Sequence, residues 1–261
     1  MILRERQDRI LKTLRSGGAA SVSELAQALQ VSQSTIRRDL DLLDGNGELT
    51  RTYGGATVRP GQTVTEDGDG GTIEQAFEAD AGEQSDLKRA MGKQAAALIK
   101  DESVVLLDIG TTTPFIAREL RGRPVTVITS NLAVLDELRN DSAARLVLLG
   151  GVLRRNYRTF VGSLTQHALT QVSADMLFLS CTGVRAAGNV VDNMAVEAPI
   201  KQSMIEAADS VVLMASAVKF PGTGALRLCS LADVDVVITT PGANEQTLNI
   251  CREAGGRVII A

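Results

Sequence analysis

Residues 31–56 have the sequence VSQSTIRRDLDLLDGNGELTRTYGGA, and this stretch decides the fold of the first part of the chain. Ser32 can cap a helix that starts at Gln33, because its hydroxyl can accept a hydrogen bond from an unpaired backbone N–H. Three apolar residues then share one face at helical spacing, namely Ile36, Leu40 and Leu43. Asn46-Gly47 ends the helix, and Glu48 to Thr52 predicts a short strand before the Gly54-Gly55 turn. We expect a recognition helix followed by a wing.

Two further helices are expected upstream. Leu3 to Leu14 has amphipathic spacing, and Ser21-Val22-Ser23 can cap a second helix from Glu24 to Leu29. Gln30-Val31 then makes a tight turn. A short helix, a tight turn and a second helix with polar and basic residues at its start have the geometry of a helix-turn-helix. The alternative is an ordinary helical hairpin whose arginines are solvated.

In a helix-turn-helix the second helix lies in the major groove, where small polar side chains and arginines reach base edges and phosphates. The candidate DNA contacts are Ser32, Gln33, Ser34, Thr35, Arg37 and Arg38 on the helix, with Arg51 and Tyr53 on the wing. The expected partner is double-stranded operator DNA.

The segment VSQSTIRRDLDLL, followed by the basic strand and YGGA, resembles the N-terminal signature of the DeoR-type family of bacterial transcriptional repressors. The opening residues RERQDRILKTLRSGGAASVSELAQAL continue the resemblance. The family motif usually contains His-Gly-Gly-Ala, and Tyr53 stands at the His position here. A phenol can still hydrogen-bond to phosphate. The resemblance implies a winged helix-turn-helix DNA-binding domain over residues 1–57.

Composition limits the remaining possibilities. Of the 261 residues, 44% are hydrophobic but only 3% are aromatic, so the core must be aliphatic. Three widely spaced cysteines, without a CxxC, are expected as buried thiols in a reducing cytoplasm. A single His excludes a His-rich metal site, and we expect no metal or cofactor. No apolar run approaches the roughly 20 residues of a membrane span, and the charged N-terminus has no signal-peptide core.

The net charge of −4 is unevenly distributed. Residues 1–59 carry +2, residues 60–86 carry −8 and residues 87–261 carry +2. The acidic, Gly-rich stretch predicts a solvated linker over residues 58–86, although mimicry of DNA charge by this stretch is an alternative. The small surplus of positive charge on the DNA-binding segment predicts a homo-oligomer, a dimer or a tetramer, because several copies together would make more phosphate contacts.

Residues 87–261 predict an α/β domain that binds an effector and mediates oligomerisation. Short apolar runs alternate with amphipathic helices, which indicates a parallel sheet covered on both faces. The expected strands are Val104–Leu107, Val125–Ile128, Leu146–Leu149, Met176–Leu179, Val211–Met214, Val234–Ile238 and Val258–Ile260. The expected helices include Glu83–Lys100, Asn131–Arg139, Val196–Ala207 and Asn244–Glu253.

Polar residues gather where these strands end, which is where parallel sheets bind ligands. The first strand leads into Asp108-Ile109-Gly110-Thr111-Thr112-Thr113, the second into Thr129-Ser130-Asn131 and the third into Gly150-Gly151. A Gly-Thr-Thr-Thr turn before a helix offers N–H groups and hydroxyls to a phosphate. The alternative is that the threonines only cap the helix. Successive polar strand ends, together with Lys219, favour an anion site.

The segments DIGTTT, ITSNLAVLDEL, LLGGVLRR, FVGS and VEAPIKQSM resemble the effector domain of the same family. That domain resembles the folds of sugar-phosphate isomerases and CoA-transferases, and the family implies a phosphorylated sugar or polyol as inducer. The resemblance implies these effector-binding residues: Lys88, Asp108, Gly110, Thr111, Thr112, Thr129, Asn131, Gly150, Gly151, Arg154, Glu197 and Lys219, with Lys201 pairing with Glu197. Ser216 and Thr240 stand where the family often has Asp, and Pro221 replaces a usual Gly, so we expect an atypical effector.

The leading functional hypothesis is a repressor released from its operator by a sugar phosphate. An isomerase is the main competitor, with Asp108, Glu197 and Lys219 as acid–base candidates. An enzyme has no use for a winged helix, and Ser216 and Thr240 remove acids, so we expect no enzymatic activity. An activator, or a nucleoid-type binder without effector control, is a third hypothesis, and the intact second domain disfavours the nucleoid-type binder.

Overall fold

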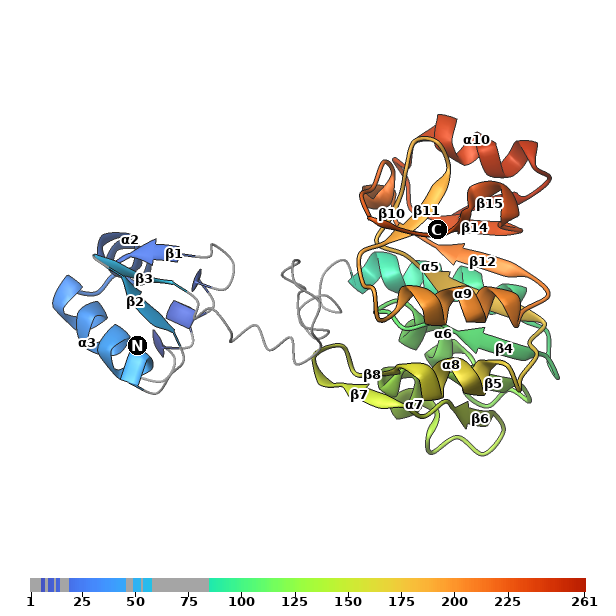
Figure 1. Cartoon of the computed structure of the whole chain (residues 1–261), viewed down its shortest axis with the longest axis horizontal. Helices are drawn as coiled ribbons and strands as arrows, with labels where there is room; N and C mark the ends of the chain where they lie inside the picture. The colour runs from blue at the N-terminus through green and yellow to red at the C-terminus, as the bar shows by residue number, and fades with distance from the viewer. Residues whose placement is uncertain are drawn as a thin grey trace. The chain divides into compact units, whose positions relative to one another are not determined.

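The computed structural model describes residues 6–7, 9–11, 13–14, 19–45, 49–52, 54–57 and 85–261. The chain divides between residues 73 and 74 into two compact units, and each is described by itself (Figure 1). Nearly all of the predicted linker, as well as Tyr53, lies outside the described residues. No helix among the described residues is long and apolar enough to cross a membrane.

The first unit is a winged helix. Its described residues between 6 and 14 are helical and are followed by β1 (Ala19–Ser21), α2 (Val22–Leu29), α3 (Gln33–Gly45), β2 (Thr50–Thr52) and β3 (Gly55–Thr57). The three strands form an antiparallel sheet in the order β1-β3-β2. Ile10, Leu14, Leu25, Ile36 and Leu40 meet in an aliphatic core, as the helical spacing predicts.

Local sequence explains two boundaries of this unit. The Ser21 hydroxyl accepts a hydrogen bond from Glu24 N at 3.2 Å, and the Glu24 carboxylate accepts one from Ser21 N at 2.8 Å. This capping box starts α2 at Val22, two residues earlier than expected. A Cβ atom at Gly55 would lie 2.3 Å from the Ala20 carbonyl oxygen, so β3 can approach β1 only with glycine there. The sequence did not predict β1.

The second unit is built on a seven-stranded parallel sheet in the order β15-β14-β12-β9-β4-β5-β6. Its strands are β4 (Val104–Leu107), β5 (Thr126–Thr129), β6 (Arg145–Leu148), β9 (Met176–Ser180), β12 (Val211–Met214), β14 (Val236–Thr239) and β15 (Arg257–Ile260). The prediction of a parallel sheet is confirmed, and each predicted strand overlaps one of these seven. The bounds of β4 and β12 are as predicted, and those of the other five strands move by one or two residues, because cross-strand hydrogen bonds rather than apolar runs fix the strand ends.

Helices cover both faces of this sheet, as its continuous apolar strands predict (Figure 1). One face packs against α5 (Ser85–Leu98), α6 (Thr113–Glu119) and α7 (Leu132–Leu138). The opposite face packs against α8 (Ser163–Leu169), α9 (Ala198–Glu206) and α10 (Glu245–Glu253). The start of α5 makes Ser85 and Asp86, the last residues of the predicted linker, helical.

Two smaller sheets were not predicted. A hairpin pairs β7 (Val152–Arg154) with β8 (Thr159–Val161), and the short helix η1 (Arg155–Tyr157) lies between them. An antiparallel sheet joins β10 (Gly183–Val184), β11 (Asn189–Asp192) and β13 (Leu226–Ser230). The remaining short helices are η2 (Ala217–Lys219) and η3 (Leu231–Asp233). These strands have two to five residues, too few for a clear alternating pattern.

Candidate functional site

The predicted DNA-reading face of α3 is accessible to solvent. Ser32 caps the helix as predicted, because its hydroxyl accepts a hydrogen bond from Thr35 N at 3.2 Å. Ser34 Oγ and Thr35 Oγ1 each lie 2.8 Å from Ser32 Oγ, which forms a small hydroxyl cluster at the helix start. Gln33, Arg37 and Arg38 are exposed, whereas Ile36, Leu40 and Leu43 are buried. The helix therefore separates an apolar inner face from a polar outer face.

Arg51 on β2 already has partners within the protein. Its Nη1 donates to the Arg37 carbonyl oxygen at 3.2 Å and lies 3.1 Å from Asp41 Oδ1. Arg37 Nη2 donates to Gln33 Oε1 at 3.3 Å. Arg51 thus connects the wing to the recognition helix without DNA, and any phosphate contact must compete with Asp41.

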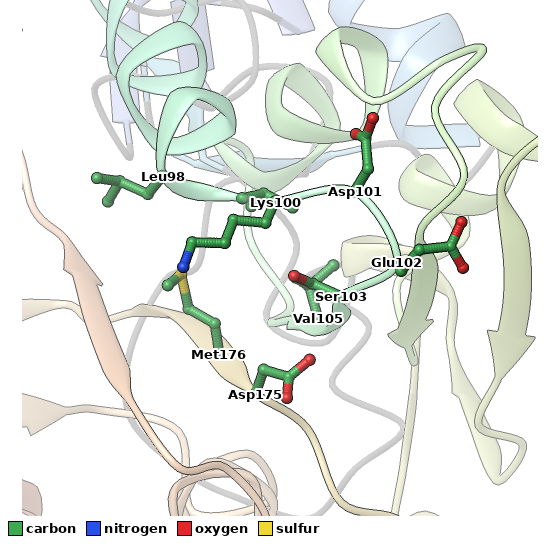
Figure 2. A pocket seen from close by; sticks show the side chains of 9 residues that line it. Leu98, Lys100, Asp101, Glu102, Ser103, Val105, Asp175 and Met176 are labelled. Atoms are coloured by element: carbon green, nitrogen blue, oxygen red, sulfur yellow. The ribbon is translucent and has the colours of Figure 1, made fainter.

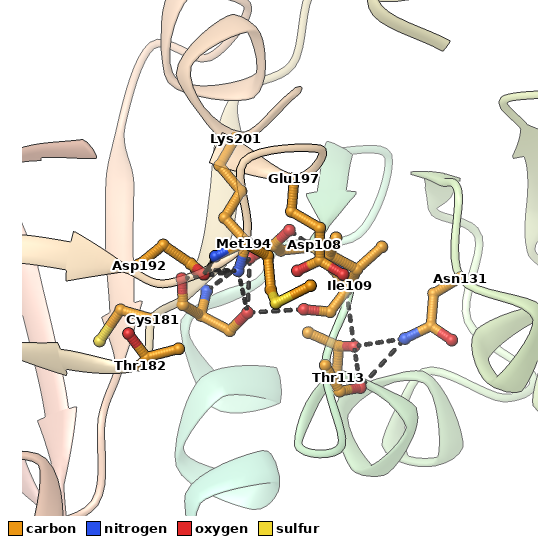
Figure 3. A network of polar contacts seen from close by, with 12 residues as sticks. Asp108, Ile109, Thr113, Asn131, Cys181, Thr182, Asp192, Met194, Glu197 and Lys201 are labelled. Carbon is orange, nitrogen blue, oxygen red and sulfur yellow. Dashed lines mark hydrogen bonds and ion pairs between the residues drawn. The ribbon is translucent and has the colours of Figure 1, made fainter. Parts of the chain in front are cut away.

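In the second unit, Asp108 is fully buried where β4 ends, and its carboxylate organises the surrounding loops (Figure 3). Oδ1 accepts a hydrogen bond from Ile109 N at 2.7 Å, and Oδ2 accepts one from Ser180 N at 2.8 Å. Lys201 Nζ on α9 lies 3.1 Å from Asp108 Oδ2 and 3.2 Å from Asp192 Oδ2. One buried ammonium group therefore bridges two buried carboxylates from β4 and β11.

The charges of this cluster are mutually stabilised. Burial alone would lower the pKa of Lys201, but the carboxylates of Asp108 and Asp192 raise it well above its ordinary value. Burial would raise the pKa of Asp192, yet attraction to Lys201 and backbone N–H donors hold it below its usual value. Lys201 Nζ also lies 2.9 Å from Ser180 Oγ. Because Lys201 stays protonated, it cannot act as a base toward Ser180, and the pair is structural.

The Gly110–Thr112 loop rests on this cluster. Ser180 Oγ donates to the Asp108 carboxylate at 2.6 Å, and a Cβ atom at Gly110 would lie 3.0 Å from Ser180 Oγ. Thr113 Oγ1 donates to the Asp108 carbonyl oxygen at 2.8 Å, so this hydroxyl has a structural role. Thr112 occupies the N-cap position of α6 without a side-chain cap. The hydroxyls of Thr111 and Thr112 make no hydrogen bond to the described residues, and Thr111 is buried.

Two polar residues at the carboxyl end of β5, Thr129 within the strand and Asn131 after it, have their side-chain groups engaged inside the fold. Thr129 Oγ1 donates to the Leu107 carbonyl oxygen at 2.7 Å. Asn131 Nδ2 donates to the Gly110 carbonyl oxygen at 3.0 Å, and Asn131 Oδ1 accepts from Ala133 N at 2.9 Å, which caps α7. Both side chains are fully buried. They hold the Gly110 loop in place from the β5 side.

The Gly150–Gly151 turn follows β6. The Gly150 carbonyl oxygen accepts a hydrogen bond from Thr165 Oγ1 at 2.9 Å. A Cβ atom at Gly151 would lie 2.1 Å from the same hydroxyl, so only glycine allows this approach to α8. A Cβ atom at Gly150 would meet no heavy atom within 4 Å. The backbone at Gly150 therefore has open space next to it.

Arg154 and Glu197 form a buried ion pair that joins the β7–β8 hairpin to the start of α9. The Arg154 guanidinium also lies over the Tyr157 ring, 5.3 Å from its centroid. Burial raises the pKa of Glu197 to about 7, against the attraction of Lys201 and Arg154. Figure 3 places Glu197 beside Asp108 and Lys201, so the ion pair belongs to the same polar layer.

Lys219 reaches this layer from η2, where its ammonium group donates to the Cys181 carbonyl oxygen. Thr240 Oγ1 accepts a hydrogen bond from Ala217 N at 2.9 Å, and Ser216 occupies the N-cap position of η2. Thr240 thus supports the short helix that carries Lys219, whereas the Ser216 side chain makes no cap hydrogen bond to it. Lys88 is half-buried in α5, a helix that packs against α6.

Hydrogen bonds join Asn131 to Gly110 and Thr129, and an ion pair joins Arg154 to Glu197, so direct contacts link only some of the predicted effector residues. Asn131 and Ser180 both touch the Gly110 loop, and Cys181 leads from Ser180 to Lys219. Sequence reasoning did not single out Ser180 and Asp192, and it named Lys201 only as a partner of Glu197. A signal existed for Asp192, which follows the apolar pair Val190-Val191 in the same way that Asp108 follows its strand.

A hollow of about 370 Å³ lies elsewhere, beside the amino ends of β4 and β9 (Figure 2). It is lined by residues that include Lys100, Ser103, Asp175 and Met176. Asp175 Oδ2 already accepts a hydrogen bond from Val104 N at 2.7 Å. Ligands of parallel sheets bind at the opposite, carboxyl ends of the strands, so this hollow is not the candidate site.

Three relatives match almost the whole chain. An L-fucose operon activator of Haemophilus influenzae is 28% identical over 95% of this chain and 96% of its own length. A glycerol-3-phosphate regulon repressor of the same organism is 30% identical over 90% of this chain and 88% of its own. The HTH-type transcriptional repressor GlcR of Bacillus subtilis is 27% identical over 100% and 97%.

A ribose 5-phosphate isomerase structure from Methanocaldococcus jannaschii covers 52% of this chain and 54% of its own, with 18% identity and a TM-score of 0.39. That similarity is too slight to carry an argument. The model of the DeoR-like helix-turn-helix domain matches residues 6–60, and the model of the DeoR C-terminal sensor domain matches residues 83–240. The chain therefore belongs to the DeoR family and is a DNA-binding transcriptional regulator rather than an enzyme.

Proposed function

We propose that this regulator represses an operon of carbohydrate metabolism and leaves its operator when a phosphorylated sugar or polyol binds the sensor unit. The names of its relatives refer to an L-fucose operon and a glycerol-3-phosphate regulon, which supports this class of effector. The observation that carries the proposal is the Gly110–Thr112 loop. It is fixed from below by Asp108 and Ser180, while the hydroxyls of Thr111 and Thr112 have no hydrogen-bond partner among the described residues.

On DNA, the exposed face of α3 enters the major groove. Arg37 and Arg38 reach base edges or phosphates, and the hydroxyl cluster of Ser32, Ser34 and Thr35 lies beside them with Gln33. Arg51 contacts phosphate after it leaves Asp41, and Tyr53 on the wing contributes its phenol. Hydrogen bonds to base edges and phosphates act only over a short distance, so this unit must lie directly against the duplex.

At the effector site, Gly110, Thr111 and Thr112 hold the phosphate through backbone N–H groups and hydroxyls. Lys219 neutralises charge near the sugar, and Lys88 approaches from α5. Buried side chains shape the pocket around the sugar hydroxyls, namely Asp108, Thr129, Asn131, Arg154 and Glu197, and the more exposed turn of Gly150 and Gly151 lies at its edge. Because Ser216 and Thr240 replace carboxylates, the set of hydroxyls recognised differs from that of relatives with Asp at both positions.

Release from DNA requires that the effector prefer the conformation with low DNA affinity, since equal affinity for both conformations shifts nothing. The sensor unit also joins subunits into a dimer or a tetramer. A single DNA-binding segment with a charge surplus of +2 supplies few phosphate contacts, and paired units would double them.

The test uses the full-length protein and an operator duplex selected from a random-sequence library. Gel shifts with paired phosphorylated and free sugars, glycerol 3-phosphate and glycerol included, should show release by phosphorylated compounds only. Release by free sugars alone would contradict the phosphate site. A reporter gene downstream of the selected operator then separates repression from activation, which matters because one relative is an activator.

A further inference from the structure

Asp39 is the buried carboxylate of the recognition helix. It follows Arg38 in the sequence, yet it is only 2% exposed and shares the inner face of α3 with Ile36, Leu40 and Leu43. A carboxylate in this position cannot reach DNA. It must therefore act on the protein itself, and a buried charge is tolerated only with a well-placed partner.

That partner is Arg6 in the first helix. Arg6 Nη2 donates to Asp39 Oδ1 at 3.0 Å and Arg6 Nε donates to Asp39 Oδ2 at 2.5 Å. The Arg6 side chain is only 14% exposed, so water screens the pair weakly. The hydrogen bond to Asp39 raises the pKa of Arg6, against the opposing effect of burial. The pair is bidentate and connects residues 33 positions apart in the sequence.

The apolar contacts of α3 do not provide the same constraint. Burial of Ile36, Leu40 and Leu43 is non-directional, so these contacts hold the helix against the core without defining its rotation closely. A planar guanidinium bound through two parallel hydrogen bonds fixes both distance and orientation. Base recognition depends on such orientation, because a bidentate contact to a base edge fails when the side chain is displaced.

We propose that Asp39 is a positioning residue: its pair with Arg6 sets the rotation and axial position of the recognition helix, so that Arg37 and Arg38 meet the groove in register. The proposal rests on DNA binding by the family and does not depend on the identity of the effector. It concerns a residue that touches no DNA.

If Asp39 influenced DNA binding only through its negative charge, its removal would change DNA affinity in the opposite direction. Removing a carboxylate from a helix close to DNA reduces repulsion of the phosphates and raises affinity for any duplex. Asp44 offers a matched control, since it lies on the same helix and makes no ion pair or hydrogen bond with the described residues. Asp39→Asn and Asp44→Asn remove the same charge, but only the first removes the connection to Arg6.

The experiment measures affinity of the full-length protein for two duplexes, one selected from a random library and one of the same length with scrambled sequence. We expect Asp39→Asn to lose about 10-fold or more in affinity for the selected duplex, comparable to one lost base contact. Its affinity for the scrambled duplex should stay equal or rise, and Asp44→Asn should lose affinity for neither. Unchanged affinity of Asp39→Asn for the selected duplex, equal losses on both duplexes, or an equal loss in Asp44→Asn would overturn the proposal.

If circular dichroism shows that Asp39→Asn lowers helix content, Arg6→Lys decides instead. Lysine keeps the positive charge opposite Asp39 but cannot form the two parallel hydrogen bonds. We expect an intermediate loss on the selected duplex with unchanged affinity for the scrambled one. Affinity for the selected duplex equal to that of the unaltered protein, or equal losses on both duplexes, would show that orientation through Arg6 is unnecessary.

Discussion

The two units of the chain use polar residues in opposite ways. In the DNA-binding unit, Arg37 and Arg38 are exposed before any DNA binds. In the sensor unit, Asp108 and Asn131 are fully buried and already hydrogen-bonded to the protein. A domain that binds a DNA duplex needs side chains that project into solvent and can enter a groove. A sensor of a small ligand needs a rigid polar layer under the pocket, with only a few groups left for the ligand itself.

The largest expected effect tests the buried layer. Lys201→Met leaves the carboxylates of Asp108 and Asp192 without their shared cation, and it should reduce the free energy of unfolding by about 3–5 kcal/mol. Urea denaturation of the full chain, followed by circular dichroism, measures this loss. Lys93→Met replaces an exposed lysine of α5 and should change stability by less than about 0.5 kcal/mol. Similar losses in the two variants would contradict the contrast between the units.

Substitutions on the exposed face of the DNA-binding unit should have the opposite pattern, with a large effect on DNA binding and a small effect on stability. Arg37→Ala or Arg38→Ala should weaken operator binding by about 1–3 kcal/mol if the side chain reads a base, and should flatten the salt dependence if it touches phosphate. Stability should hardly change, because both side chains are exposed. Fluorescence anisotropy at several salt concentrations measures both quantities, with Arg257→Ala as an exposed control in the sensor unit. Full operator affinity in both variants would remove these residues from the interface.

The difference between the units also explains what the sequence could predict. Exposed reader residues follow from local pattern, since Ser32 caps α3 and apolar spacing turns Arg37 and Arg38 outward. The sheet follows from continuous apolar runs. The Asp192–Lys201 contact depends on β11, which pairs with β13 although α9 and β12 lie between them in the chain. Local periodicity cannot predict a pairing between such distant strands. The roles of Thr111 and Thr113 also diverge only in three dimensions, because one hydroxyl folds back onto Asp108 and the other does not.

A single hydroxyl of the sensor should control release. Thr111→Val should leave operator affinity intact and abolish release by a phosphorylated effector, because it removes a hydroxyl of the proposed effector site that makes no hydrogen bond to the described residues. A typical coupling of about 1–3 kcal/mol would appear in the unaltered protein as a roughly 5- to 150-fold loss of operator affinity at saturation. Thr126→Val, at the amino end of β5 and so away from the proposed effector site, is the control. If the effector still released Thr111→Val from the operator, the threonine loop would have only a structural role.

The buried Glu197 predicts a pH effect confined to the sensor unit. Its pKa is about 7 in the folded chain, above its ordinary value of 4.5, so the folded state binds the proton more strongly. The contribution of Glu197 to stability is therefore complete below pH 4.5 and is lost as pH rises through about 7. The Tm of the unaltered protein minus that of Glu197→Gln should fall between pH 5 and pH 8. A difference that stays constant, or rises, would show that Arg154 keeps Glu197 ionised throughout.

The smallest effect concerns the exposed ion pair that connects the wing to α3. Asp41 is 67% exposed and Arg51 is 30% exposed, so water screens their attraction and the pair contributes less than about 1 kcal/mol to stability. Asp41→Asn should therefore barely change unfolding by urea, in contrast to Lys201→Met. It should raise affinity for any duplex, because it frees Arg51 for phosphate and removes a negative charge from the recognition helix. A loss of stability comparable to that of Lys201→Met would mean that this exposed pair contributes strongly to the fold of the DNA-binding unit, in addition to the buried pair of Arg6 and Asp39. Reduced affinity for DNA would instead mean that Arg51 serves the fold by holding the wing, and that its predicted contact with DNA is wrong.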